Sequence, residues 1–215
     1  NHLLNVFRMG GKQEFDFDYM AGVYEHPFEI EYVDDPAAIA DAHESVRNVG
    51  RHLDGCRIGF DAGGSDRKVS AVINGEPVYS EEVVWHPKVT SDPMYHYEGI
   101  LSAMKSAAAH MPRVDAIGVS SAGVYIDNKV KVASLFLKVP PEAFEKTIKN
   151  IYIDVAKEIG NVPLEVANDG DVTALAGAMS MECGKVLGIA MGTSEAGGYV
   201  DANMNIMGWL NELAF

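Results

Sequence analysis

Two segments of nine residues share one pattern, and this repeat constrains the fold more than any other feature of the chain. Residues 58–66 read Ile-Gly-Phe-Asp-Ala-Gly-Gly-Ser-Asp, and residues 187–195 read Leu-Gly-Ile-Ala-Met-Gly-Thr-Ser-Glu. Each segment is an apolar strand pattern followed by a tight glycine-containing turn, a serine and an acidic residue. The repeat therefore predicts two lobes built on one plan, with two glycine-lined loops facing each other across a cleft.

The rest of the hydrophobic pattern predicts an α/β domain with a mixed sheet. Asn74-Gly75 is a strong hairpin signal between two strand patterns, so the first strands are expected to be antiparallel. Later strand patterns alternate with helical ones, as parallel crossovers require. Strands are expected at 57–61, 68–73, 77–85, 114–120, 164–167, 185–191 and 198–202, and helices at 97–111, 141–159 and from about 171 to 182.

The first 56 residues are interpreted as an N-terminal extension. Residues 28–32 alternate apolar and acidic side chains, which predicts a half-exposed strand. Asp35-Pro36 then predicts a helix start, with an apolar stripe as far as Leu53 and a stop at Gly55. The resulting division is an extension at 1–56, a first lobe at 57–169 and the beginning of a second lobe at 170–215.

Charge and composition exclude several classes of function. The formal net charge is −14, and a surface this acidic repels nucleic-acid phosphates and anionic membranes. No apolar run reaches the roughly 18 residues of a membrane span, and the N-terminal residues have no signal-peptide pattern. The chain has two cysteines, without metal-ligand or disulfide spacing. A cytoplasmic protein without nucleic-acid or membrane partners is the simplest expectation.

The two loops have the composition of phosphate-binding turns. Small residues let backbone N–H groups converge on an anion, because no Cβ holds the ligand away. Asp61, at the end of the first strand, could orient a hydrated Mg²⁺. The alternative for each loop is a plain turn that uses glycine for its positive φ. The predicted phosphate-binding residues are Asp61, Gly63, Gly64, Ser65, Gly192, Thr193 and Ser194.

A third segment closes a strand with Asn168-Asp169-Gly170. Ligands of α/β sheets gather at such strand ends. Asp169 could accept the proton of a substrate hydroxyl that attacks phosphorus, and Asn168 could hydrogen-bond a neighbouring hydroxyl. The alternative is a structural turn in which Asp171 caps the following helix.

Taken together, these segments resemble the ROK family of sugar kinases and repressors. Residues 60–65 are similar to its first phosphate motif, residues 166–176 to its Asn-Asp segment, and residues 188–193 to the start of its second phosphate motif. The resemblance runs from about residue 57 to the end. It implies an actin/hexokinase-type, ribonuclease H-like fold, with ATP as co-substrate, Mg²⁺, a sugar acceptor and Asp169 as catalytic base. The sugar-contacting positions that it implies are Ser121, Gly123, Asn168, Asp169 and Glu212.

The chain also departs from the family pattern. Ser194 and Glu195 follow the second phosphate motif where the family has further small residues, and a carboxylate beside phosphate is unfavourable unless a cation neutralises it. The zinc motif and adenosine-binding region of the family have no counterpart here. These departures predict an incomplete second lobe, and they leave open a homodimer or completion by a second chain segment.

Two other functions compete with a sugar kinase. A non-catalytic sugar-binding regulator on the same fold would tolerate the altered second loop. A hydrolase could use Ser120 or Ser121, but residues 118–123 miss the Gly-x-Ser-x-Gly spacing of a nucleophile elbow. ATP-dependent phosphorylation of a sugar hydroxyl remains the leading hypothesis.

Overall fold

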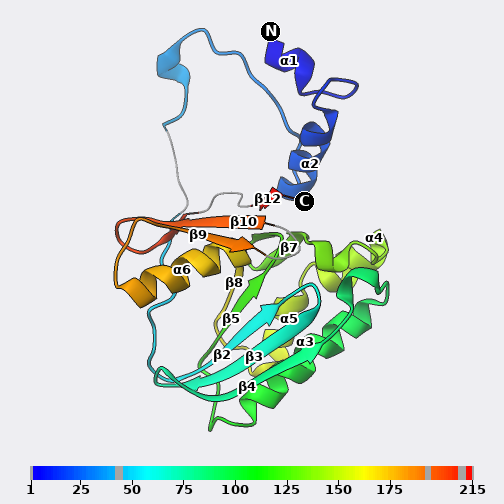
Figure 1. Cartoon of the computed structure of the whole chain (residues 1–215). Helices are drawn as coiled ribbons and strands as arrows, with labels where there is room; N and C mark the ends of the chain where they lie inside the picture. The colour runs from blue at the N-terminus through cyan, green and yellow to red at the C-terminus, as the bar shows by residue number, and fades with distance from the viewer. Residues whose placement is uncertain (1, 42–45, 192–194, 208–211, 215) are drawn as a thin grey trace. The chain divides into compact units, whose positions relative to one another are not determined.

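In a computed structural model that describes all residues except 1, 42–45, 192–194, 208–211 and 215, the described residues form two five-stranded β-sheets and a two-stranded one (Figure 1). The described residues separate into two units, 1–44 and 45–215. All three sheets belong to the second unit. The predicted lobe limits, 57–169 and 170–215, stay a prediction.

The first unit contains two helices, α1 (His2–Val6) and α2 (Glu14–Tyr24), and one 3-10 turn, η1 (Pro36–Ala38). The strand predicted at 28–32 is wrong: this segment is irregular. Its Phe28 packs against the rings of Phe7 and Phe17, with both pairs of centroids 6.1 Å apart. Contacts among aromatic side chains therefore override the local alternation of apolar and acidic residues.

The helix predicted to continue from Asp35 to Leu53 is also wrong. Asp35 does cap a turn, because its carboxylate accepts a hydrogen bond from the N–H of Ala37, but the turn ends at Ala38. In the second unit Val46–Arg47 is strand β1, which pairs with β11 (Ile206–Met207). Pairing with a strand 160 residues later is a tertiary contact that no local pattern reveals.

The first sheet has the strand order β4-β3-β2-β5-β8. Strands β2 (Cys56–Ala62), β3 (Asp66–Ile73) and β4 (Glu76–Val84) are antiparallel neighbours, and Asn74 and Gly75 both take positive φ in the predicted hairpin turn. Strands β5 (Ala116–Ser121) and β8 (Leu164–Asn168) then add in parallel beside β2. This confirms the α/β class and the ribonuclease H-like mixed sheet.

Two helical segments cover one face of this sheet (Figure 1). Helix α3 (Pro93–Ala108) starts earlier than predicted, because Asp92 caps it and Pro93 occupies its first position. The helix predicted at 141–159 is instead interrupted: α4 (Pro141–Ala143) leads into a π-helical turn, η4 (Phe144–Ile148), and then α5 (Ile151–Ile159). Apolar side chains of this region are buried at Ile148, Ile151, Tyr152 and Val155.

The second sheet has β9 (Val186–Met191) and β10 (Glu195–Val200) as an antiparallel pair, with β11 and β12 (Glu212–Ala214) on the other side of β10. Helix α6 (Asp169–Met181) packs on β9 and β10. Glycines permit a very close approach: a Cβ on Gly170 would lie 2.8 Å from the backbone of Gly197, and one on Gly198 would overlap the Gly170 carbonyl. The first turn of α6 therefore lies directly against the second sheet.

A short hairpin lies in the chain between β5 and β8 and was not predicted. Strands β6 (Val124–Ile126) and β7 (Lys129–Val132) pair through a turn in which Asp127 and Asn128 both have positive φ, 52° and 62°. Asp and Asn tolerate this conformation better than other non-glycine residues. The hairpin is joined to β8, because the side-chain amide of Asn128 binds the backbone of Leu164 and Val166.

Burial of His96 in the core predicts a pH-dependent stability. Its side chain is fully buried against Trp85, Tyr95 and Phe136, and burial lowers the pKa of His96 below its usual 6.5 despite the opposing effects of the Thr90 carbonyl and Asp92. Below about pH 6.5 the unfolded chain binds a proton that folded His96 does not, so the free energy of unfolding falls as pH falls.

Urea unfolding at pH 7.5 and 5.5 tests this. We expect His96→Gln to show a smaller loss of stability on acidification than the native chain, since the substituted side chain does not titrate. An equal loss in both chains would contradict a role for His96.

No helix in the described part of the chain is both long and apolar enough to cross a membrane. Cys56 is buried in β2 and Cys183 is exposed, and both are free thiols.

Candidate functional site

A cavity of about 400 Å³ lies where the first predicted loop and the strand ends meet. We call it the loop cavity. It brings five of the predicted site residues into one place: Asp61, Gly63, Gly64, Ser65 and Asp169. The other described residues that line it are Ala62, Lys68, Lys88, Ser120, Ala122, Ser134, Leu135, Thr173, Ala190 and Met191.

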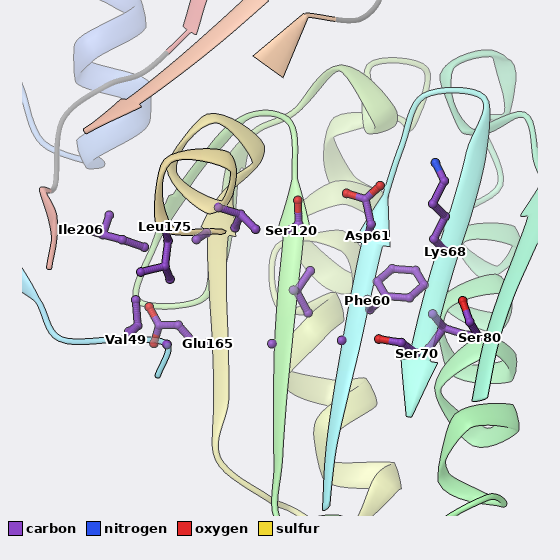
Figure 2. Close-up of a pocket in the computed structure, with 17 residues that line it drawn as sticks. Val49, Phe60, Asp61, Lys68, Ser70, Ser80, Ser120, Glu165, Leu175 and Ile206 are labelled. Carbon is purple, nitrogen blue, oxygen red and sulfur yellow. The ribbon is translucent and has the colours of Figure 1, made fainter. Parts of the chain in front are cut away.

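Sheet register explains why Asp61 and Asp169 share this cavity. Asp61 is paired with Ser120 on the parallel neighbour β5, and the next residue of β5, Ser121, is paired with Asn168 at the end of β8. The carboxyl ends of β2, β5 and β8 therefore lie at one edge of the sheet, where ligands of α/β folds bind. Figure 2 shows the side chains of Asp61, Lys68 and Ser120 projecting at this edge.

The turn between β2 and β3 does not use its glycines for positive φ. Neither Gly63 nor Gly64 has a positive φ, so the plain-turn alternative loses its physical reason. Space is the constraint: a Cβ on Gly63 would lie 2.7 Å from the carbonyl oxygen of Asp66, and one on Gly64 would lie 2.6 Å from the side chain of Lys88. Close approach is the property that a phosphate-binding turn needs.

Trp85 holds this turn in place. Its indole N–H donates to the carbonyl of Gly63 at 2.8 Å, and its backbone N–H donates to the carbonyl of Ser65 at 3.1 Å. The ring is buried, with 1% of its surface exposed, and the guanidinium of Arg67 lies 5.7 Å from its centroid. The turn is thus held at Gly63 and Ser65 by the side chain and the backbone of one core residue.

Lys68 and Asp66 form an ion pair beside the turn, with 2.6 Å between Nζ and Oδ1. The hydrogen bond from Lys68 lowers the pKa of Asp66, and the same bond raises the pKa of Lys68 with smaller contributions from Glu82 and Asp61. Because both side chains are partly exposed to solvent, we ascribe little stability to the pair. Its effect on the cavity is that the charge of Lys68 is largely neutralised by Asp66.

The loop after β5, predicted to line a sugar pocket, is fixed by a buried hydroxyl cluster. Tyr125 donates a hydrogen bond to the Ser121 hydroxyl at 2.7 Å, and Tyr152 donates to it at 3.3 Å. Burial raises the pKa of Tyr152 to about 12 and holds that of Tyr125 well above its usual value. Ser121 is fully buried, so its hydroxyl does not reach the cavity. Ser120, one residue earlier, does line it.

Gly123 and Asn168 connect this loop to α6. Gly123 has φ 125°, and a Cβ there would overlap the carbonyl of Val132. The Asn168 amide donates to the Gly123 carbonyl at 2.9 Å, while its side-chain oxygen accepts from the N–H of Gly170 at 2.8 Å. Asn168 rather than Asp171 therefore caps α6, and it places Asp169 at the first helical position. Sugar contacts by Gly123 and Asn168 stay predictions.

Four predicted positions cannot be located at the cavity. Gly192, Thr193 and Ser194 lie outside the described residues, although their neighbours Ala190 and Met191 line the cavity. Glu212 belongs to β12, which pairs with β10 at Ala196, but its side chain is not described.

The residues that line the cavity in the described part of the chain suit a Mg²⁺ ion that keeps waters and phosphate oxygens as ligands, and do not form a site in which the protein supplies every ligand. Among the described residues, no three His, Cys, Asp or Glu side chains come together as a metal-binding group. Mg²⁺ usually binds through one or two carboxylates, with waters and substrate phosphates as its remaining ligands. Asp61 and Asp169 line the cavity and could supply such carboxylate oxygens. The described residues that line the cavity include no histidine, so they offer no histidine base for a hydrolase that would use Ser120 or Ser121 as its nucleophile.

Sequence reasoning missed several polar residues of the cavity. Lys88, Ser134 and Thr173 lie on η2 (Pro87–Val89), η3 (Ser134–Phe136) and α6, and the first two belong to short connecting segments. No motif marks such positions. For Thr173 a signal existed, because it lies four residues after Asp169 and hence on the same helix face.

The fold defined by this sheet and its cavity is the actin/hexokinase-type α/β fold. No protein-family model and no curated protein matches the chain. Solved structures that match include a ROK family transcriptional regulator homologous to E. coli Mlc, with a TM-score of 0.57 and 16% identity over 75% of this chain and 40% of that one.

Two kinases match similarly. An Arthrobacter inorganic polyphosphate/ATP-glucomannokinase has a TM-score of 0.54 and 22% identity, over 69% of this chain and 59% of that one. A ROK hexokinase from Thermus thermophilus has a TM-score of 0.52 and 17% identity, over 68% and 46%. The chain spans about half the length of these proteins, and the likeness shows the fold they share.

Proposed function

We propose that this chain is an ATP-dependent sugar kinase, with a sugar hydroxyl as phosphoryl acceptor and Asp169 as general base. The observation that supports this most strongly is the loop cavity, in which Asp169 shares one space with Asp61 and the glycine turn at 63–65. The likeness to two solved sugar kinases supports it independently.

Each residue then has a defined role. The backbone N–H groups of the 63–65 turn bind phosphate oxygens of the donor, because Gly63 and Gly64 have no side chain of their own to hold a phosphate away. Asp169 accepts the proton of the sugar hydroxyl as its oxygen forms a bond to the terminal phosphorus, and the bond from that phosphorus to the nucleoside diphosphate breaks. The fixed 121–123 loop orients the sugar, and this positioning supplies most of the rate acceleration over the uncatalysed reaction.

A bound Mg²⁺ would neutralise charge on the donor phosphates. Asp61 would hold it through water at the end of β2, on the side of the cavity where the glycine turn begins. The proposed sugar and ATP are the partners, and the sugar itself is not specified by the described residues.

A second candidate is a sugar-binding regulator without catalysis. It is favoured by Glu195 at the start of β10, immediately after the segment proposed for the second phosphate loop, since a carboxylate there opposes phosphate binding. The ROK transcriptional regulator among the structural matches has the same fold.

Isothermal titration calorimetry separates the two candidates. A panel of hexoses and N-acetylhexosamines is titrated into the chain with and without Mg-ATP, and product formation is followed by mass spectrometry. A kinase is expected to bind Mg-ATP and to form a sugar phosphate. Sugar binding that is independent of Mg-ATP, without product, would reject the kinase in favour of the regulator.

A further inference from the structure

One lysine of the loop cavity is placed directly over the glycine turn. Lys88 belongs to the 3-10 turn η2, which follows β4. A Cβ built on Gly64 would lie 2.6 Å from Cε and 2.9 Å from Nζ of Lys88. The ammonium group therefore occupies the space that a side chain at position 64 would fill, beside the backbone that is proposed to bind phosphate.

The segment that carries Lys88 is bound to the turn by the core. Trp85, three residues earlier, makes both hydrogen bonds to the turn, at the carbonyls of Gly63 and Ser65. Pro87 is buried, and the hydroxyl of Thr90 donates to the carbonyl of His86 at 2.7 Å, which closes the η2 turn. The position of Lys88 over the glycine turn is therefore set by the fold rather than by a flexible loop.

Lys88 forms no ion pair within the described part of the chain. The other lysine of the cavity, Lys68, is paired with Asp66. Lys88 is half-buried and shares the cavity with two carboxylates, Asp61 and Asp169. A donor with several phosphate charges would be repelled by these carboxylates, so binding requires a cation at this place.

We propose that Lys88 binds the phosphate chain of the phosphoryl donor, with its ammonium group bridging the donor oxygens and the 63–65 turn. This deepens the proposed function and rests on it. The shared ligand chemistry is a linear chain of phosphates, which either a nucleoside triphosphate or inorganic tripolyphosphate supplies. Glycine at position 64 is then required because any side chain would displace the lysine.

A double-mutant cycle in the full chain tests this. Mg-ATP and magnesium tripolyphosphate are titrated by calorimetry into the native chain, Lys88→Ala, Gly64→Ala and the double variant. Loss of a charged hydrogen-bond donor is expected to weaken binding of both ligands by about tenfold to a hundredfold. Gly64→Ala alone is expected to weaken binding too, but to add nothing in the Lys88→Ala background, where the space is vacant.

Lys105→Ala, on the exposed side of α3, is the matched control and is expected to bind both ligands as the native chain does. Lys88→Met retains the aliphatic part of the side chain, and it repeats the test if the Tm of Lys88→Ala is well below that of the native chain. Native affinity in Lys88→Met would overturn the inference and leave the kinase proposal standing. A loss confined to Mg-ATP would also overturn it, because the nucleoside would then be the group contacted. A native chain that binds neither ligand would overturn the proposed function itself.

Discussion

Asp169→Asn is expected to lower the rate of sugar phosphorylation by about a hundredfold to ten-thousandfold, the usual contribution of a positioned general base. The amide has the same shape as the carboxylate but cannot accept the proton of the attacking hydroxyl. Because Asn168 caps α6 and fixes the first helical position, the fold around residue 169 should not change. The measurement is kcat in an assay coupled to ADP release, with a sugar identified by calorimetry.

Sugar affinity and thermal stability of this variant should stay near native values, which distinguishes a lost proton acceptor from a disordered site. Asp154→Asn is the control, since this carboxylate lies on α5, paired with Lys157 away from the cavity. A kcat within a few fold of the native value in Asp169→Asn would remove Asp169 from the mechanism.

Gly198→Ala is expected to destabilise the chain by about 3 kcal/mol or more, at the upper end of the cost of overpacking a well-packed contact. The new Cβ would overlap the carbonyl of Gly170 and lie 2.5 Å from the Cα of Asp171. Both are backbone atoms of the first turn of α6, which cannot move aside as a flexible side chain could. Urea unfolding followed by circular dichroism measures the loss.

Gly118→Ala is the matched control. Gly118 is also a strand glycine, in β5, but a Cβ there would have no atom within 4 Å apart from those of its own two chain neighbours. Its stability should change by about 0.5 kcal/mol or less, or rise slightly, because alanine reduces the freedom of the unfolded chain. Equal destabilisation by both substitutions would show that the contact between α6 and β10 is not close in solution.

The sequence predicted the centre of the fold well and its periphery poorly. Short-range patterns that agree with their tertiary setting predicted the hairpin at Asn74-Gly75 and the strands β2, β5 and β8. They also predicted Asp61 near the end of β2 and Asp169 directly after β8. The prediction for residues 28–53 was wrong, because β1 is stabilised by pairing with β11 and Phe28 is held by contacts with other aromatic rings. Such partners are remote in sequence, and periodicity contains no information about them.

In the candidate site, too, local features were predictable from the sequence and features that depend on remote contacts were not. Glycines and acidic residues at strand ends were predictable, since turn chemistry and strand endings are local features. Ser120 and Ser121 show what the sequence could not predict. Side chains alternate along β5, so only one of the two adjacent serines faces the cavity. The register of β5 with β2 and β8 shows that this serine is Ser120. Lys88 enters the cavity because Trp85 binds the glycine turn, which depends on the pairing of β4 with β3.

The tyrosine pair under the 121–123 loop has a consequence for how pH profiles of this protein are assigned. Tyr152 has a pKa of about 12, and that of Tyr125 is well above the usual value of 10, so both phenols stay neutral at any pH used for assays. A decline in turnover on the alkaline side, between about pH 8 and 10, would therefore have its origin in another ionisation. The underside of the 121–123 loop therefore keeps the same charge throughout such a pH profile.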